Sequence, residues 1–262
     1  MTVAPELSPA ITVEQVTAVH GSGRQARTTL SPTSLSVSRG ESVAVIGRSG
    51  AGKSTLADVV LGLRLPASGS VTVCQEHWCS ATRRPAKRLR SLVQGIPQDP
   101  VAAFVPRWTI RRSIERAIRS LSRSAPDGLG EHPAGRDQAR EHARDAEARI
   151  SRAAELAHLE PSLLDKRVTE VSGGQAQRAA IARALAVSPT VLVADEPTSA
   201  LDPRTSAEVS AALLSIVEDE GIALLLVTHD PEFAARCTRT VEITAPAGDP
   251  LTPAAPATAS AA

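Results

Sequence analysis

The 262-residue sequence is poor in aromatic side chains and in cysteine, and its positive and negative charges nearly cancel. Aromatic residues make up 2% of the chain and tyrosine is absent, so a core must be built from Ala, Val, Leu and Ile, for which the 42% hydrophobic content is sufficient. The net charge of +1 argues against a general nucleic-acid-binding protein. Three cysteines without paired spacing indicate reduced thiols in a cytosolic protein.

Long apolar runs are also missing. Because a membrane-spanning helix needs roughly 18 or more consecutive apolar residues, we expect none here. The N-terminus has no charged region followed by an apolar core, so we expect no signal peptide. If such a protein works at a membrane, another chain must bring it there. Its length suits one large domain or a core with an additional lobe.

The most informative stretch is a glycine-rich loop between a predicted strand (42–46) and a predicted helix (56–61). It reads G-x-x-x-x-G-K-S, and in this context the pattern predicts a phosphate-binding loop. Glycines allow backbone N–H groups to curl around phosphate oxygens, and the helix that begins at about Lys53 favours the same negative charge. We expect Lys53 to reach the β- and γ-phosphates of ATP and Ser54 to bind Mg²⁺. The predicted loop consists of Gly47, Arg48, Ser49, Gly50, Ala51, Gly52, Lys53, Ser54 and Thr55.

Two carboxylates follow a predicted buried strand at 190–194. Asp195 is predicted to help hold Mg²⁺, and Glu196 to accept the proton of an attacking water as general base. The alternative that the two carboxylates merely end the strand is disfavoured, because two carboxylates after a buried strand would cost free energy of folding unless they had a partner.

His229 and Gln98 are predicted to complete the catalytic set with Glu196. His229 follows the predicted buried strand at 222–227, at the sheet edge where ligands bind in open α/β proteins. Gln98 lies in a loop between the core and a helical lobe, where it can touch Mg²⁺ or the attacking water. The predicted metal ligands are therefore Ser54, Gln98 and Asp195.

A second anion site is predicted where Ser172, Gly173 and Gly174 precede a helix. One chain rarely needs two sites for the same γ-phosphate. Two copies that face each other head to tail would each supply one site to the other's ATP.

The order of the predicted elements indicates an α/β protein with a parallel sheet covered on both faces. The patterns predict strands at 11–19 (an edge strand), 36–42, 69–73, 190–194 and 222–227, and helices at 109–121, 138–159, 175–187 and 203–218, the last capped by Asp202. Residues from about 100 to 170 form a predicted helical lobe, which contains a flexible loop at 122–136. Residues 1–10 are a predicted N-terminal tail, and the Pro/Ala-rich residues 245–262 a disordered one.

Two further clusters have more than one interpretation. The basic stretch from Arg83 to Arg90 could bind nucleic acid or lipid headgroups, but the lack of interleaved aromatics favours a solvated helix face. Cys74, His77 and Cys79 could be metal ligands, but no fourth ligand follows at zinc spacing, which favours ordinary thiols.

Taken together, these motifs resemble the nucleotide-binding subunit of an ATP-binding cassette (ABC) transporter over roughly residues 11–244. The family's motifs occur in order as Walker A (47–55), Q-loop (Gln98), signature (171–175), Walker B (191–196), D-loop (199–202) and switch histidine (His229). The resemblance implies an α/β fold: a P-loop NTPase, RecA-like core with an N-terminal antiparallel β-subdomain and an inserted helical subdomain.

The resemblance also implies a mechanism and partners. Two such domains clamp two ATP molecules, with Ser172, Gly173, Gly174, Gln175 and Asp202 contributing to nucleotide binding. His20 falls nearest the place of the aromatic residue that usually stacks on adenine. The implied partners are transmembrane permease subunits, a second ABC ATPase subunit in a homo- or heterodimer, and an extracytoplasmic solute-binding protein, with no nucleic acid. The implied location is the cytoplasmic face of the cell membrane.

A finer similarity favours the importers of dipeptides, oligopeptides and nickel. It rests on residues 98–100, Pro106-Arg107 and 169–178, although Ala103-Phe104-Val105 replaces the Ser-Leu-Asn usual in that subfamily. The alternatives are an exporter ATPase and a soluble ABC ATPase that acts on ribosomes or DNA. The soluble class usually has two cassettes or long coiled coils, whereas only about 120 residues separate Lys53 from Ser172 here.

Overall fold

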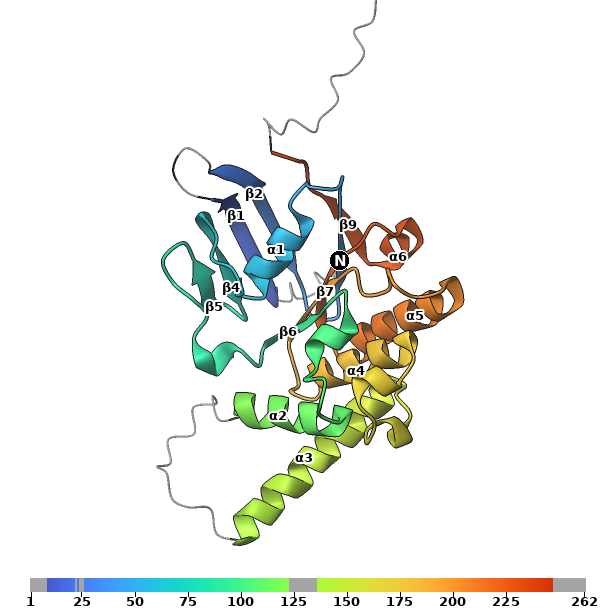
Figure 1. Cartoon of the computed structure of the whole chain (residues 1–262). Coiled ribbons are helices and arrows are strands. Elements are labelled where there is room, and N and C mark those ends of the chain that lie inside the picture. Colours follow the sequence, from blue (N-terminus) through green and yellow to red (C-terminus); the bar gives the residue numbers. More distant parts are fainter. Residues whose placement is uncertain (1–8, 22, 24–25, 123–135, 247–262) are drawn as a thin grey trace, which may run out of the picture.

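The structure, a computed structural model, describes residues 9–21, 23, 26–122 and 136–246. Its strands form two sheets: a four-stranded antiparallel sheet of order β2-β1-β4-β5 and a five-stranded parallel sheet of order β6-β7-β8-β3-β9 (Figure 1). The predicted flexible loop and disordered tails fall largely on residues outside the described part. Within that part, no helix is long and apolar enough to cross a membrane.

The antiparallel sheet corrects two predictions. It comprises β1 (Ile11–His20), β2 (Arg27–Val37), β4 (Ser68–Val73) and β5 (Glu76–Ser80). The prediction that the first strand is an edge strand is wrong, because β1 pairs with both β2 and β4. Alternating burial shows that one face of a strand is covered, and it does not reveal how many neighbours the strand has. β2 also starts well before the predicted strand at 36–42.

The parallel sheet brings the ends of three functional strands together. It comprises β3 (Ser42–Ile46), β6 (Val93–Ile96), β7 (Val191–Asp195), β8 (Ala223–Val227) and β9 (Arg239–Glu242). β8 lies between β7 and β3, and all three run in the same direction. Their carboxyl ends therefore meet at one edge of the sheet, where ligands bind in open α/β folds.

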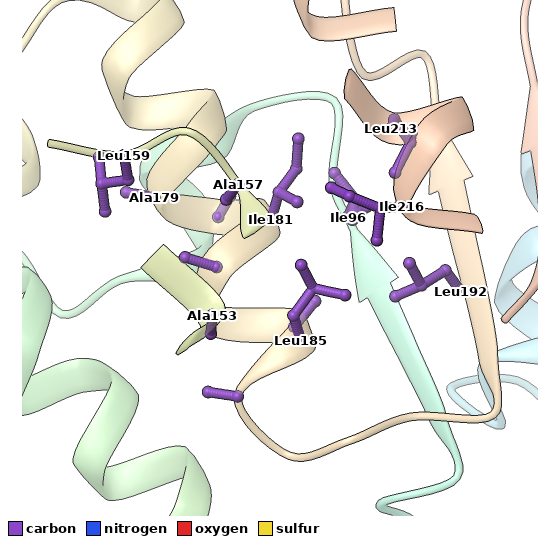
Figure 2. Packing of buried hydrophobic residues seen from close by; sticks show 14 of the residues in the cluster. Ile96, Ala153, Ala157, Leu159, Ala179, Ile181, Leu185, Leu192, Leu213 and Ile216 are labelled. Carbon is purple, nitrogen blue, oxygen red and sulfur yellow. The ribbon is translucent and has the colours of Figure 1, made fainter. Parts of the chain in front are cut away.

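Alternate residues of each central strand face two separate cores. One face of the sheet packs against α1 (Lys53–Val60) and the antiparallel sheet. The other face packs against the remaining helices, as Figure 2 shows for Ile96 and Leu192 beside side chains of the helical lobe and core. These helices are α2 (Ile110–Ser122), α3 (Arg136–Leu156), α4 (Gly173–Leu185), α5 (Pro203–Asp219) and α6 (Pro231–Arg236), and the 3₁₀ turns at Pro100–Ala103, Pro161–Leu163 and Val168–Glu170 lie with them. A further 3₁₀ turn, Lys87–Leu89, contributes Leu89 to the core on the first face.

Candidate active site

The glycine-rich loop connects β3 to α1, as predicted, and its glycines adopt conformations that other residues avoid. Gly47, Gly50 and Gly52 have φ angles of +147°, +80° and +100°. A Cβ atom on Gly47 would lie 2.4 Å from the carbonyl oxygen of Ile243, and one on Gly52 would lie 2.4 Å from that of Thr29. The loop is therefore held close to neighbouring backbone on both sides, which only glycine permits at these two positions.

Lys53 is the first residue of α1 and its side chain folds back across the loop. Its Nζ donates hydrogen bonds to the carbonyl oxygens of Gly47 at 2.9 Å and Arg48 at 3.2 Å. Arg48, Ser49 and Gly50 are exposed, whereas Ala51 is buried and anchors the loop in the core. An ammonium group, a helix N-terminus and a glycine-rich turn thus occupy one place, which suits the binding of a polyphosphate.

Ser54, in the first turn of α1, lies beside Asp195, the last residue of β7. The Ser54 hydroxyl donates to Oδ1 of Asp195 at 3.3 Å. Burial raises the pKa of the Asp195 carboxyl, an effect reinforced by the charges of Glu196 and Asp58 and opposed by the Ser54 hydrogen bond and the Lys53 charge. A hydroxyl and a carboxylate beside a phosphate-binding loop are the oxygen ligands that Mg²⁺ uses together with substrate phosphates and water.

No other arrangement in the part of the chain that the structure describes suggests a metal site. Among the described residues, no group of three or more His, Cys, Asp or Glu side chains could hold a metal ion. The alternative that Cys74, His77 and Cys79 bind a metal is therefore not supported. Cys79 is fully buried in β5, and burial raises the pKa of its thiol to about 11, which keeps it protonated.

Glu196 and His229 contact each other directly. Nδ1 of His229 lies against Oε2 of Glu196, and the side chain of Glu196 is 16% exposed whereas that of His229 is 69% exposed. Glu196 has a φ angle of +49°, unusual for a residue other than glycine, and its backbone N–H donates to the carbonyl oxygen of Val227 at 2.9 Å. Such strained conformations occur preferentially at functional sites.

Gln98 is linked to Glu196 through Ser199, a contact that the sequence did not predict. Nε2 of Gln98 donates to Oγ of Ser199 at 3.3 Å, and Oγ of Ser199 donates to the backbone carbonyl oxygen of Glu196 at 3.0 Å. Ser199 was predicted only as part of the D-loop. Its position three residues after Glu196, in a tight turn, is the feature of the sequence that could have predicted its contact with Glu196.

The signature residues lie on a different element from the phosphate-binding loop. Ser172 caps α4: its hydroxyl accepts from the N–H of Gln175 at 3.3 Å, and the Gln175 side chain accepts from the N–H of Ser172 at 3.0 Å. A Cβ atom on Gly174 would lie 2.5 Å from Cγ2 of Thr205 in α5, so the small residue permits close packing of the two helices. A Cβ atom added to Gly173 would have Leu201, in the D-loop, as its nearest neighbour.

Two further predicted site residues also lie outside the cluster of Lys53, Asp195 and Glu196. Asp202 caps α5 by accepting from the N–H of Thr205 at 3.0 Å, and hydrogen bonding to Thr205 lowers the pKa of its carboxyl. His20 is exposed at the end of β1. The single chain therefore brings together the phosphate loop, the carboxylates, Gln98 and His229. The signature residues begin α4, and Gly173 and Gln98 line one cavity beside Leu201.

The comparisons with known proteins identify the family. The ABC transporter family matches residues 30–199, which is more than half of the chain. The chain belongs to the ABC transporter ATPase family. It is 39% identical over 215 residues to the nickel import ATP-binding protein NikE of Brucella suis biovar 1 (80% of this chain, 74% of the relative) and 36% identical over 217 residues to that of Escherichia coli K12 (82% and 74%).

A solved ABC cassette has the same fold. The dimeric post-hydrolysis structure of the ATP-binding cassette MJ0796 with ADP and Pi superimposes with a TM-score of 0.70 at 26% identity, covering 89% of this chain and 94% of that one. The family resemblance and the predicted P-loop NTPase fold are thereby confirmed. The protein is an ATP-binding ABC ATPase, as the motifs predicted.

Proposed function

We propose that this chain is the ATP-hydrolysing subunit of an ABC importer for nickel, peptides or a related small solute. The observation that carries the importer assignment is the 36–39% identity to nickel import ATP-binding proteins over about four-fifths of the chain. The cassette spans about 11–244, with a helical subdomain at about 100–170. An exporter would use the same ATPase chemistry, and a soluble ABC ATPase that acts on ribosomes or DNA is the more distant alternative.

In the proposed mechanism, each residue of the cluster has one task. The backbone N–H groups of the glycine-rich loop and the ammonium of Lys53 bind the β- and γ-phosphates. Ser54, Asp195 and Gln98 would hold Mg²⁺, which would neutralise charge on the phosphate oxygens. Glu196 accepts a proton from the attacking water, and its contact with His229 orients its carboxylate for that role.

A second ABC ATPase subunit completes the site. Ser172, Gly173, Gly174, Gln175 and Asp202 of one subunit act on the nucleotide bound to the other. The support is that the signature begins α4, a different element from α1, which begins at the phosphate-binding loop of the same chain. His20 lies nearest the adenine in this proposal. The further partners are transmembrane permease subunits and an extracytoplasmic solute-binding protein, with the ATPase peripheral at the cytoplasmic face of the membrane and no nucleic acid involved.

Copurification from the host membrane tests this proposal. The tagged chain is purified from detergent-solubilised membranes, and its partners are identified by mass spectrometry. Two permease chains together with a solute-binding protein are expected. Recovery of permeases with a periplasmic or extracellular domain but no binding protein would favour an exporter, and recovery of ribosomal or DNA-binding proteins without a permease would overturn the transport assignment.

A further inference from the structure

Positive charge is concentrated in one part of a nearly neutral chain. Residues 59–122 contain eleven Lys and Arg but only three Asp and Glu, a net charge of +8, whereas the whole chain carries +1. The rest of the chain is therefore negative, at −7. Three of the four large hydrophobic side chains that are exposed in the described structure also lie within this stretch: Leu63, Val101 and Val105. Exposed apolar and basic side chains thus occur together.

The charge is densest in the loop between β5 and β6 (81–92), which we call the basic loop. The acidic side chain of Glu76 pairs with Arg88 of this loop. In the described part of the chain, no acidic side chain pairs with the other four basic residues, and all four are exposed: Arg83, Arg84, Lys87 and Arg90. The favoured prediction of a solvated helix face is only partly correct, since just Lys87–Leu89 is helical, as a single 3₁₀ turn.

An exposed leucine lies next to the basic loop. The loop packs on the end of α1, because a Cβ atom on Gly62 would lie 2.4 Å from Cγ of Pro85. Leu63 follows Gly62 directly and is 69% exposed, the most exposed large hydrophobic residue of the described chain. The approach of Gly62 to Pro85 therefore brings the chain at Leu63 close to the chain at Arg84. The sequence did not predict that this leucine and the basic loop are neighbours, because about twenty residues separate them along the chain.

We propose that the basic loop and Leu63 form a surface that binds the anionic phospholipid headgroups of the membrane. A basic cluster is attracted to an anionic leaflet, and an exposed apolar side chain at its border can enter the interfacial region. Single-stranded nucleic acid is less suitable, because the basic loop contains no aromatic side chain on which bases could stack. The proposal rests on the proposed function, which places the chain at a membrane.

The expected strength follows from the number of unpaired charges. A basic side chain near an anionic membrane surface contributes about a fivefold factor in binding. Reversing Arg83 and Arg84 should therefore lower the vesicle partition coefficient by roughly 25-fold or more. Because the attraction is screened over about 10 Å at 0.1 M salt, binding should also weaken as the salt concentration rises.

Cosedimentation of the full chain with vesicles tests the proposal. Vesicles of phosphatidylcholine that contain about 30% of the anionic lipid phosphatidylglycerol are compared with vesicles of phosphatidylcholine alone. We expect salt-sensitive binding to the anionic vesicles only, a loss with Arg83→Glu/Arg84→Glu, and a smaller loss with Leu63→Ser. Lys87→Glu/Arg90→Glu changes the other end of the loop and should give a similar loss, so the test does not depend on the folding of one variant.

The matched control is Arg39→Glu/Arg144→Glu, which makes the same change of charge at two exposed arginines outside residues 59–122. The proposal would be overturned by equal binding to both kinds of vesicle, by an equal loss in the control pair, or by preference for duplex DNA over anionic vesicles in a competition. ATP binding is measured on the same samples. Because the assay contains no permease, failure of the unmodified chain to bind anionic vesicles while it still binds ATP refutes this surface and leaves the proposed ATPase function unaffected.

Discussion

Substitution of Gly52 by alanine tests whether the phosphate-binding loop depends on close backbone contact. Gly52 caps α1 with a φ angle of +100°, and an added Cβ would lie 2.4 Å from the carbonyl oxygen of Thr29 and 3.0 Å from Cδ1 of Leu30. Gly221 provides a matched control, because its φ angle is +62° and nothing lies within 4 Å of its added Cβ. Both variants incur the cost of the left-handed conformation, but only Gly52→Ala also meets a steric barrier.

The difference between the variants can be worked out from these contacts. A left-handed backbone costs alanine about 1–2 kcal/mol, which is the whole expected loss for Gly221→Ala. Thr29 belongs to β2, which pairs with β1, so its carbonyl cannot move freely. Overpacking of this kind adds about 1–3 kcal/mol, so Gly52→Ala should lose about 2–5 kcal/mol in total. Since domains of this kind have a stability of about 5–15 kcal/mol, the variant should remain folded in most of this range.

Urea unfolding measures the two free energies, and the affinity for ATP measures the geometry of the loop. Gly52→Ala should unfold at lower urea than Gly221→Ala and bind ATP more weakly than the wild type, because relieving the clash displaces the loop and the start of α1. Gly221→Ala should keep its affinity for ATP. Equal destabilisation of the two variants, or wild-type ATP affinity in Gly52→Ala, would show that the contact with Thr29 does not constrain the loop.

Four further predictions concern individual side chains. Glu196→Gln should bind ATP but hydrolyse it about 10²- to 10⁴-fold more slowly in a phosphate-release assay; near-normal turnover would remove Glu196 as the base. Ser199→Ala should lower kcat several-fold without changing the affinity for ATP, and Ser199→Thr, which keeps the hydroxyl, should restore turnover. Burial raises the pKa of Asp195, so its ionisation opposes folding as the pH rises through that raised pKa; Asp195→Asn should unfold at higher urea than the wild type at pH 7, with a difference that narrows as the pH falls toward 3.8. Cys79, whose pKa of about 11 reflects burial, should react with a thiol reagent at pH 8 only after unfolding.

The parts of the fold that were predicted correctly have strong local signals. β7 and β8 are buried on both faces, so they appear in the sequence as continuous apolar runs. The start of α5 is encoded by Asp202 as cap and proline at the first position. β5 and β9 were missed because they are short strands at sheet edges, and β9 has exposed side chains at three of its four positions.

The candidate site divides in the same way. The phosphate loop and the Asp195-Glu196 pair could be located because each follows a buried strand and has a distinctive composition. The link from Gln98 through Ser199 to Glu196 could not, since the two ends are about 100 residues apart and meet only when β6 pairs with β7. Spacing along the chain contains no information about such a pairing until the strand order is known.

This link connects the glutamate to the packing of the helical lobe. Ile96, the last residue of β6, is buried in the core formed with α3 and α4, and Gln98 follows two residues later (Figure 2). Close-packed interiors transmit displacements instead of absorbing them, so a shift of the lobe must move the end of β6. Gln98 would then pull on Ser199, whose hydroxyl is bonded to the carbonyl of Glu196. We expect a change at Ser199 to alter the direction of the Glu196 carboxylate, because the backbone of Glu196 is already in a strained conformation.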